Sequence, residues 1–340
     1  MKFKIAGMAT LMAASLATTT AGMAGEYDDV SLRYASFLPE NYYQSEADKL
    51  FIQRVAEGSD GAVKIQPFWQ ASLGKPRELL ALTSSGAVDF SNIVTGFYPS
   101  ELPFSSVTNA LPMVFFDGEK VVEATADLYK NNPTISAELA KNNLEPVLMR
   151  FLPNYRIICT SPIRTMDDLR GKKIQTYGAF VPVVMEAIGA VPVNAPLTET
   201  YESLQRGVLD CGYLHQRGME FRKWHEVAPY LSDIDFGVIN AYVVFMNKAR
   251  FDSLNEATRT LIKEAGAEAT AKALVDMATE DSLGRDDMLA AGAELVEFQD
   301  KEALRAAVPD MLQVWAKQMA ESGHEKEANE VVEALRPLTQ

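Results

Sequence analysis

Short β-type runs alternate with amphipathic helical runs along most of this chain, and that alternation limits the folds open to it. The run at 31–37 has strand composition, 45–57 repeats apolar residues at helical spacing, and 63–68 alternates like a strand. A helical run at 77–85 and a strand-like run at 88–94 follow. After residue 150 the strand-like runs are 156–160, 173–177, 191–194 and 208–214. Strands separated by helices form parallel βαβ units, so the sequence predicts an α/β architecture.

One spacing pattern occurs twice and indicates two similar lobes. The pattern Glu-x7-Gly-x2-Asp spans 78–89 and again 199–210. In each copy the glycine suits the left-handed position after a helix, and the aspartate opens a buried strand. Chance recurrence of a common turn is the alternative. We interpret Asp89, Asp210 and Glu199 as structural, because they lie at helix-to-strand corners.

The first 24 residues have the three parts of a secretory signal peptide. Lys2 and Lys4 precede an apolar run at 5–16, and small residues lead to Ala24. The apolar run is shorter than the ~20 residues that a membrane-spanning helix needs. We therefore predict cleavage after Ala24 and a periplasmic mature protein that is not embedded in the membrane. Loss of the two lysines takes the formal charge from −14 to −16.

Charge and motifs exclude several classes of function. With 32 basic against 46 acidic side chains, the chain is not expected to bind nucleic acid. No phosphate-binding loop, nucleophile elbow or zinc-protease motif is present, so no enzyme activity and no cofactor are predicted. Cys211 and His215 lack further ligands for a metal site. Cys159 and Cys211 form a disulfide or stay as two buried thiols; the sequence leaves both open.

The last third of the chain is helical. The segment 254–292 has no proline, and its apolar residues recur at helical spacing. Unless Gly266 and Gly284 interrupt it, the segment is one helix of about 39 residues, about 58 Å long at 1.5 Å per residue. Two or three ordinary helices are the alternative. A short strand at 294–298 and a helical stretch at 311–335 complete the chain.

Three runs resemble one family in order and spacing. They are LGKPRELLALTSSGAVDFSNI at 73–93, SPIRTMDDLRGKKIQTYG at 161–178 and GAVPVNAPLTETYESLQRGVLDCGYL at 189–214. Together they resemble the substrate-binding proteins of tripartite ATP-independent periplasmic (TRAP) transporters of the dicarboxylate type. The resemblance extends from about residue 30 to the C-terminal helices.

The resemblance implies a two-lobed periplasmic binding protein fold, with an interlobe cleft, crossing hinge strands and a long helix spanning both lobes. It assigns 1–24 to the signal peptide, 25–152 to lobe I, 153–238 to lobe II, 239–253 to a return strand, 254–293 to the long helix and 294–340 to a C-terminal segment packed on the lobes. It also implies a monomer that closes around a small polar metabolite and delivers it to the small and large membrane subunits of a permease.

One departure from the family bears on the ligand. The family usually has an arginine that clamps a carboxylate where this chain has Gln175, and glutamine carries no charge. If the ligand is an organic acid, a carboxylate or a sulfonate, Arg156 must then supply the charge. The alternative is a cationic, zwitterionic or polyol ligand. A periplasmic enzyme on this fold is disfavoured because no nucleophile–base constellation is present.

The candidate ligand-binding residues lie where the predicted strands end, since ligands of such folds lie outside the carboxyl ends of strands. For Phe37, Trp69 and Val94, packing in the core is the alternative. The full set is Arg156, Gln175, Tyr177, Trp69, Phe37, Val94, Tyr213 and His215.

Overall fold

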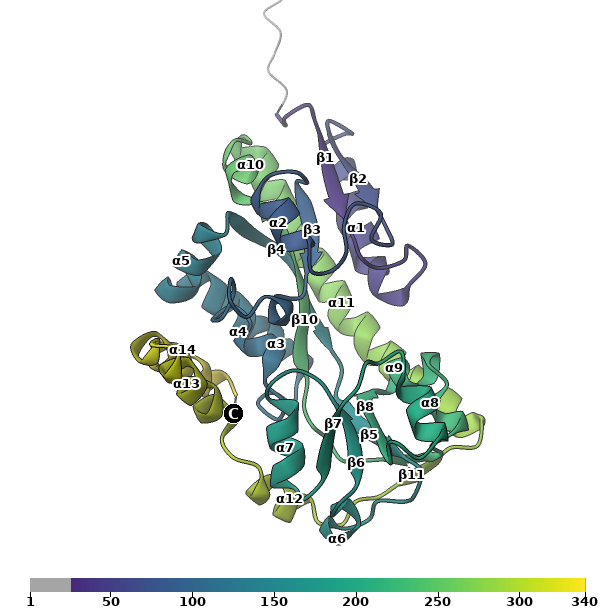
Figure 1. The fold of residues 1–340 in the computed structure, drawn as a ribbon. Coiled ribbons are helices and arrows are strands. Elements are labelled where there is room, and N and C mark those ends of the chain that lie inside the picture. The colour runs from purple at the N-terminus through teal and green to yellow at the C-terminus, as the bar shows by residue number, and fades with distance from the viewer. Residues whose placement is uncertain (1–25, 340) are drawn as a thin grey trace, which may run out of the picture.

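The protein folds around two separate sheets. The computed structural model describes residues 26–339, so the predicted signal peptide at 1–24 lies outside the described residues. A five-stranded sheet has the order β2-β1-β3-β10-β4, and a six-stranded sheet has the order β11-β9-β5-β8-β6-β7. Figure 1 shows the first sheet in the upper half and the second in the lower half. We call the two halves the first lobe and the second lobe.

The strands of the first sheet are β1 (Val30–Ala35), β2 (Val63–Phe68), β3 (Phe90–Ile93), β4 (Leu144–Leu152) and β10 (Ile239–Asn247). Those of the second are β5 (Tyr155–Cys159), β6 (Lys173–Thr176), β7 (Val191–Asn194), β8 (Cys211–His215), β9 (Tyr230–Ser232) and β11 (Glu294–Val296). The helices are α1 (Glu46–Gly58), α2 (Leu79–Ser84), α3 (Val107–Ala110), α4 (Gly118–Asn131), α5 (Pro133–Lys141), α6 (Met166–Leu169), α7 (Val181–Ala187), α8 (Thr200–Gln205), α9 (Gln216–Phe221), α10 (Lys248–Asp252), α11 (Glu256–Ala290), α12 (Lys301–Ala307), α13 (Met311–Glu321) and α14 (Glu325–Leu335).

The predicted two-lobed α/β fold is confirmed, but both sheets are mixed rather than wholly parallel. β1 pairs in parallel with β2 and β3, and β6 with β7 and β8. β10 runs antiparallel to β3 and β4, and β5 runs antiparallel to β8 and β9. The antiparallel strands carry the chain between sheets, at the β4–β5 and β9–β10 connections. The residue limits assigned to the lobes stay predictions.

The repeated corner has the same structure in both lobes. The Arg33 N–H donates to Asp89 Oδ2 over 2.6 Å, and the Lys173 N–H donates to Asp210 Oδ2 over 2.8 Å. Each aspartate therefore ties its own strand to the neighbouring parallel strand. The glycine before each has a positive φ, +75° at Gly86 and +70° at 207. The structural interpretation of the two aspartates is confirmed.

Helix α11 spans both lobes as a single helix of 35 residues, about 52 Å long. It packs on α1 and β4 in the first lobe and on α9 in the second (Figure 1). The two glycines that raised the question of a break lie at these close contacts. A Cβ at Gly266 would overlap the Val147 carbonyl, and one at Gly284 would overlap the Arg217 backbone. Glycine therefore lets the helix approach each lobe closely.

The C-terminal segment returns from the second lobe to the first. β11 pairs with β9 in the second sheet, whereas α14 packs on α4 and Trp315 contacts Phe104 edge to face. The stretch predicted at 311–335 is two helices, because Gly323 adopts a φ of +85° between them. Within residues 26–339, no helix combines the length and apolar character needed to cross a membrane.

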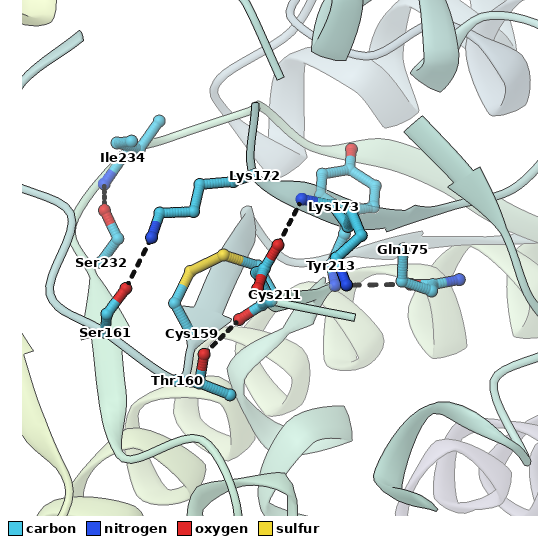
Figure 2. Close-up of a disulfide and its surroundings, with 11 residues drawn as sticks. Cys159, Thr160, Ser161, Lys172, Lys173, Gln175, Cys211, Tyr213, Ser232 and Ile234 are labelled. Atoms are coloured by element: carbon cyan, nitrogen blue, oxygen red, sulfur yellow. Dashed lines mark hydrogen bonds between the residues drawn. A yellow bond between two sulfur atoms is a disulfide. The ribbon is translucent and has the colours of Figure 1, made fainter. Parts of the chain in front are cut away.

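A disulfide joins Cys159 and Cys211, which the sequence left open. These residues face each other directly on the antiparallel strands β5 and β8 (Figure 2). Both cysteines are buried. Since the Cys211 sulfur is bonded, it is not a partner for His215 in a metal site.

Candidate functional site

Three tyrosines and a histidine gather at one edge of the second sheet. Tyr177 follows β6, Tyr213 and His215 lie at the end of β8, and Tyr155 opens β5. The ring centroids of Tyr155 and Tyr213 are 4.9 Å apart, and those of Tyr177 and Tyr213 are 5.9 Å apart. Because β5 runs antiparallel to β8, its first residue lies where β8 ends. We call these four residues the ring cluster.

The facing edge of the first lobe carries an apolar cluster. Phe37 and Val94 lie just after β1 and β3, and both pack with Tyr42 against the buried cluster that includes Tyr242 of β10. The rings of Phe37 and Tyr242 meet edge to face at 5.9 Å. The predicted residues Phe37 and Val94 therefore lie together at a strand-end edge, as expected for this fold.

Tyr42 brings the two edges together. Its ring lies 5.9 Å from that of Phe221, which ends α9 in the second lobe. Burial is the main cause that raises the pKa of Tyr155, and Tyr42 adds a smaller contribution. Phe221 is 63% exposed, so this contact lies at the rim. Aromatic side chains from both lobes thus converge between the sheets.

The ring cluster is neutral. Burial, with a smaller contribution from the Arg222 charge, lowers the pKa of His215 to about 3. Its Nδ1 accepts the Gly218 N–H over 3.2 Å, which leaves the proton on Nε2 as a donor. The 3.9 Å approach of Asp281 to Nδ1 is therefore not an ion pair. Burial also raises the pKa of Tyr155 to about 12, opposed by a hydrogen bond from Tyr177.

Gln175 bridges three strands. Its side chain is 0% exposed; Nε2 donates to the Ala195 carbonyl over 3.1 Å, and Oε1 accepts the Tyr213 N–H over 3.4 Å. Figure 2 shows the amide turned toward the Tyr213 backbone. Both ends of the amide group are thus occupied by the protein itself. The predicted ligand contact of Gln175 stays a prediction.

Arg156 lies on the other face of the second sheet from the ring cluster. The register pairs Tyr155 with His215 and Arg156 with Leu214, and neighbouring residues on a strand point to opposite faces. Arg156 Nη1 donates to the Asp233 and Ile234 carbonyls over 2.7 and 3.2 Å. The arginine lines a separate cavity of about 240 Å³ between the 233–235 segment and α12.

Trp69 also lies apart from the ring cluster. Its ring meets that of Tyr34 edge to face at 5.9 Å, and it packs against the first-lobe core on the side of α1 and α11. The structure therefore brings together five of the eight predicted residues at facing edges, Phe37, Val94, Tyr177, Tyr213 and His215. Trp69 follows β2, which pairs in parallel with β1. The predicted ligand contacts of Arg156 and Trp69 stay predictions.

Five residues at these edges were missed by the sequence reasoning, namely Tyr42, Tyr155, Phe221, Arg222 and Tyr242. The Tyr42–Tyr43 pair in the loop after the first strand was a usable signal, because aromatic loop residues after a strand lie at the ligand edge. Arg222 gave no such signal. Its position depends on how the short helix α9 turns back after β8.

Comparison with known sequences gives one family over most of the chain. The sequence model of the bacterial extracellular solute-binding protein family 7 matches residues 34–322. A solute-binding protein of Chromohalobacter salexigens is 29% identical over 282 residues, 79% of each chain. The 2,3-diketo-L-gulonate-binding periplasmic protein of Escherichia coli is 25% identical and covers 91% of this chain and 92% of its own.

Solved structures share the fold. A TRAP periplasmic solute-binding protein of Desulfovibrio salexigens superposes with a TM-score of 0.80 at 22% identity, covering 92% of this chain and 96% of its own. The corresponding protein of Roseobacter denitrificans, solved with bound β-D-glucuronate, gives 0.72 at 20% identity, covering 91% and 98%. Both likenesses cover more than nine-tenths of this chain.

Proposed function

The chain belongs to the bacterial extracellular solute-binding protein family 7, and from that premise we propose that it captures a small organic acid and delivers it to a TRAP permease. The resemblance to TRAP substrate-binding proteins in the sequence is confirmed by this membership. The E. coli relative is named for a keto acid, and the R. denitrificans neighbour holds a sugar acid. Both names support an acid ligand for this chain.

The convergence of the ring cluster with Tyr42 is the observation that carries the proposal. Three tyrosines and a neutral histidine offer hydrogen-bond donors beside aromatic faces at the ends of β6 and β8. Ligand sites combine such apolar walls with a few placed polar groups. The opposite wall comes from the first lobe, so a ligand there contacts both lobes.

We further propose that the protein works in the periplasm after cleavage behind Ala24. The proposal rests on the pattern of basic, apolar and small residues in the first 24 positions. The proposed partners are the small and large membrane subunits of the permease, with the binding protein acting as a monomer. N-terminal sequencing of the exported protein should begin at Gly25, and an intact Met1 would contradict the proposal.

The proposed role is binding without turnover. The family and the solved neighbours are solute-binding proteins, and the His215 Nδ1 atom is occupied by a backbone N–H. A ligand that binds only the folded state raises stability by about 2.7 kcal/mol at 100 times Kd. Thermal unfolding with and without each candidate compound measures this effect directly.

The test is a panel of compounds of different charge. It contains D-glucuronate, D-galacturonate, benzoate, p-toluenesulfonate, succinate, ectoine and myo-inositol, each followed by calorimetry and by chromatography of the recovered compound. We expect at least one acid to raise the melting temperature and to be recovered unchanged. A response to ectoine or myo-inositol alone would favour the zwitterion or polyol alternative. Conversion of a bound compound would show an enzyme.

A further inference from the structure

Arg222 lies where α9 ends, close in the chain to His215 of the ring cluster. His215 and Arg222 are the N-cap and the C-cap of α9, and Gly218 lies between them in the helix. The Arg222 Nη1 donates to the Gly218 carbonyl over 3.1 Å, and its Cζ lies 5.9 Å from the centre of the Phe221 ring. Phe221 in turn meets Tyr42 of the first lobe.

The charge of Arg222 acts on the ring cluster. Arg222 Nη1 donates to the Gly218 carbonyl, and the Gly218 N–H donates to His215 Nδ1, so one residue links the guanidinium to the ring cluster. Burial is the main cause that lowers the pKa of His215 and raises that of Tyr155, and the Arg222 charge favours a lower pKa at both. Among residues 26–339, Arg222 forms no salt bridge; its hydrogen bond goes to a neutral carbonyl. The neighbouring Arg217 differs, because Glu220, Glu280 and Asp287 each lie 3.1 Å from its guanidinium.

We propose that Arg222 is the charged anchor of the ligand, pairing with a single carboxylate or sulfonate while the tyrosines of the ring cluster contact a cyclic body. This inference rests on the proposed function and specifies its substrate class as a cyclic monoanion. A guanidinium matches the geometry of a carboxylate with two parallel hydrogen bonds. The faces of the tyrosine rings suit a flat or cyclic body better than an extended chain.

The charges near the ring cluster indicate that the ligand carries a single acid group. Gln175 and His215 are neutral, and Arg156 donates to carbonyls on the other face of the sheet. Beside these neutral side chains a second carboxylate would be desolvated without an adjacent opposite charge, which is costly. An open-chain dicarboxylate is therefore expected to bind more weakly than a cyclic monocarboxylate.

The experiment compares how tightly the wild-type protein and its variants bind cyclic and open-chain acids. Calorimetry measures D-glucuronate, benzoate and succinate with the wild-type protein and with Arg222→Gln, Arg156→Gln and Arg206→Gln. Arg206 is the matched control, since it is exposed at the C-terminus of α8 and pairs with Glu202. We expect Arg222→Gln to weaken the best cyclic acid at least 30-fold, and the other two variants to stay within threefold. Succinate should bind the wild type at least tenfold more weakly than that acid.

Two further measurements keep the result decisive. If Arg222→Gln folds poorly by circular dichroism, Arg222→Lys retains the charge and should keep more affinity than Arg222→Met. Retention of acid binding by Arg222→Gln, or a large loss only in Arg156→Gln, would overturn the assignment of Arg222 while leaving the organic-acid function intact. Succinate binding as tightly as the cyclic acids would overturn the substrate class. If no acid binds the wild type, the proposed function itself fails, and the anchor with it.

Discussion

The His215 imidazole makes folding sensitive to acid. Its pKa is lowered to about 3 by burial, whereas an unfolded histidine titrates near 6.5. Below about pH 6.5 the unfolded chain therefore takes up a proton that the folded chain does not. Its contribution to stability is complete above that pH and is lost progressively as the pH falls toward 3.

Replacing His215 tests whether this residue makes the protein less stable as the pH falls. Between pH 7 and pH 5 the wild type should lose about 2 kcal/mol of unfolding free energy that His215→Gln does not lose. Urea unfolding of both proteins at each pH measures the difference, and the shared titration of all other groups cancels. Parallel loss in the two proteins would mean that the folded imidazole accepts a proton.

A buried ion pair in the first lobe lies beside the apolar cluster. Arg150 Nη2 and Asp48 Oδ1 are 2.7 Å apart, with side chains 2% and 0% exposed. The Arg150 guanidinium also lies over the Tyr242 ring, 5.1 Å from its centre. Burial raises the pKa of Asp48, and the adjacent guanidinium opposes this rise. The pair thus joins α1 to β4.

Replacing only Asp48 should lower the free energy of unfolding more than replacing both Asp48 and Arg150. Asp48→Ala leaves the Arg150 charge buried and uncompensated, so we expect a loss of about 3–5 kcal/mol in urea unfolding. The double variant Asp48→Leu with Arg150→Met should recover most of that loss. Glu46→Gln, which breaks only the exposed pair with Lys49, is the control and should change stability by less than about 1 kcal/mol. A single variant as stable as the control would show that the pair is solvated.

The close packing of α11 on the two lobes depends on two glycines, Gly266 and Gly284. Ordinary helix propensity favours alanine over glycine by about 1 kcal/mol. At positions 266 and 284 we expect the opposite sign, because the added methyl group would overlap the Val147 carbonyl or the Arg217 backbone. Gly266→Ala and Gly284→Ala should each lose about 1–3 kcal/mol in chemical unfolding.

The control for this prediction is Ala267→Gly, at an exposed position of the same helix. It should lose about 1 kcal/mol through propensity alone. If either glycine-to-alanine variant is more stable than the wild type, the helix does not approach that lobe as closely as described.

Sequence patterns located most elements because periodicity depends on local composition. The runs at 63–68 and 191–194 match β2 and β7 residue for residue. The direction of β5 and β10 was not predictable, since it depends on where the chain crosses between sheets. For the same reason the face on which Arg156 lies was not predictable, because whether a strand residue points to one face or the other depends on its register with β8. Its ligand contact stays a prediction.

The two lobes differ in covalent support. The Cys159–Cys211 disulfide closes a loop of 52 residues within the second lobe. On the chain-entropy account, such a loop contributes about 4 kcal/mol by restricting the unfolded chain. Replacing both cysteines with alanine should lower the melting temperature. Amide exchange should rise in β5, β6 and β8 and change little in β1 to β3; an equal rise in both sheets would show that the lobes unfold as one unit.

β4 and β10 pair within the first sheet, and the chain crosses to and from the second lobe next to Leu152 and Ile239, while α11 packs on β4 and also on α9 of the second lobe. We expect these three elements to act as one stiff hinge, with each lobe attached to it as a rigid body, like the leaf of a door hinge. We expect such a linkage to oppose sliding and twisting and to leave one opening angle between the lobes. Distances between any two labels placed on opposite leaves should then vary together, as functions of a single opening angle.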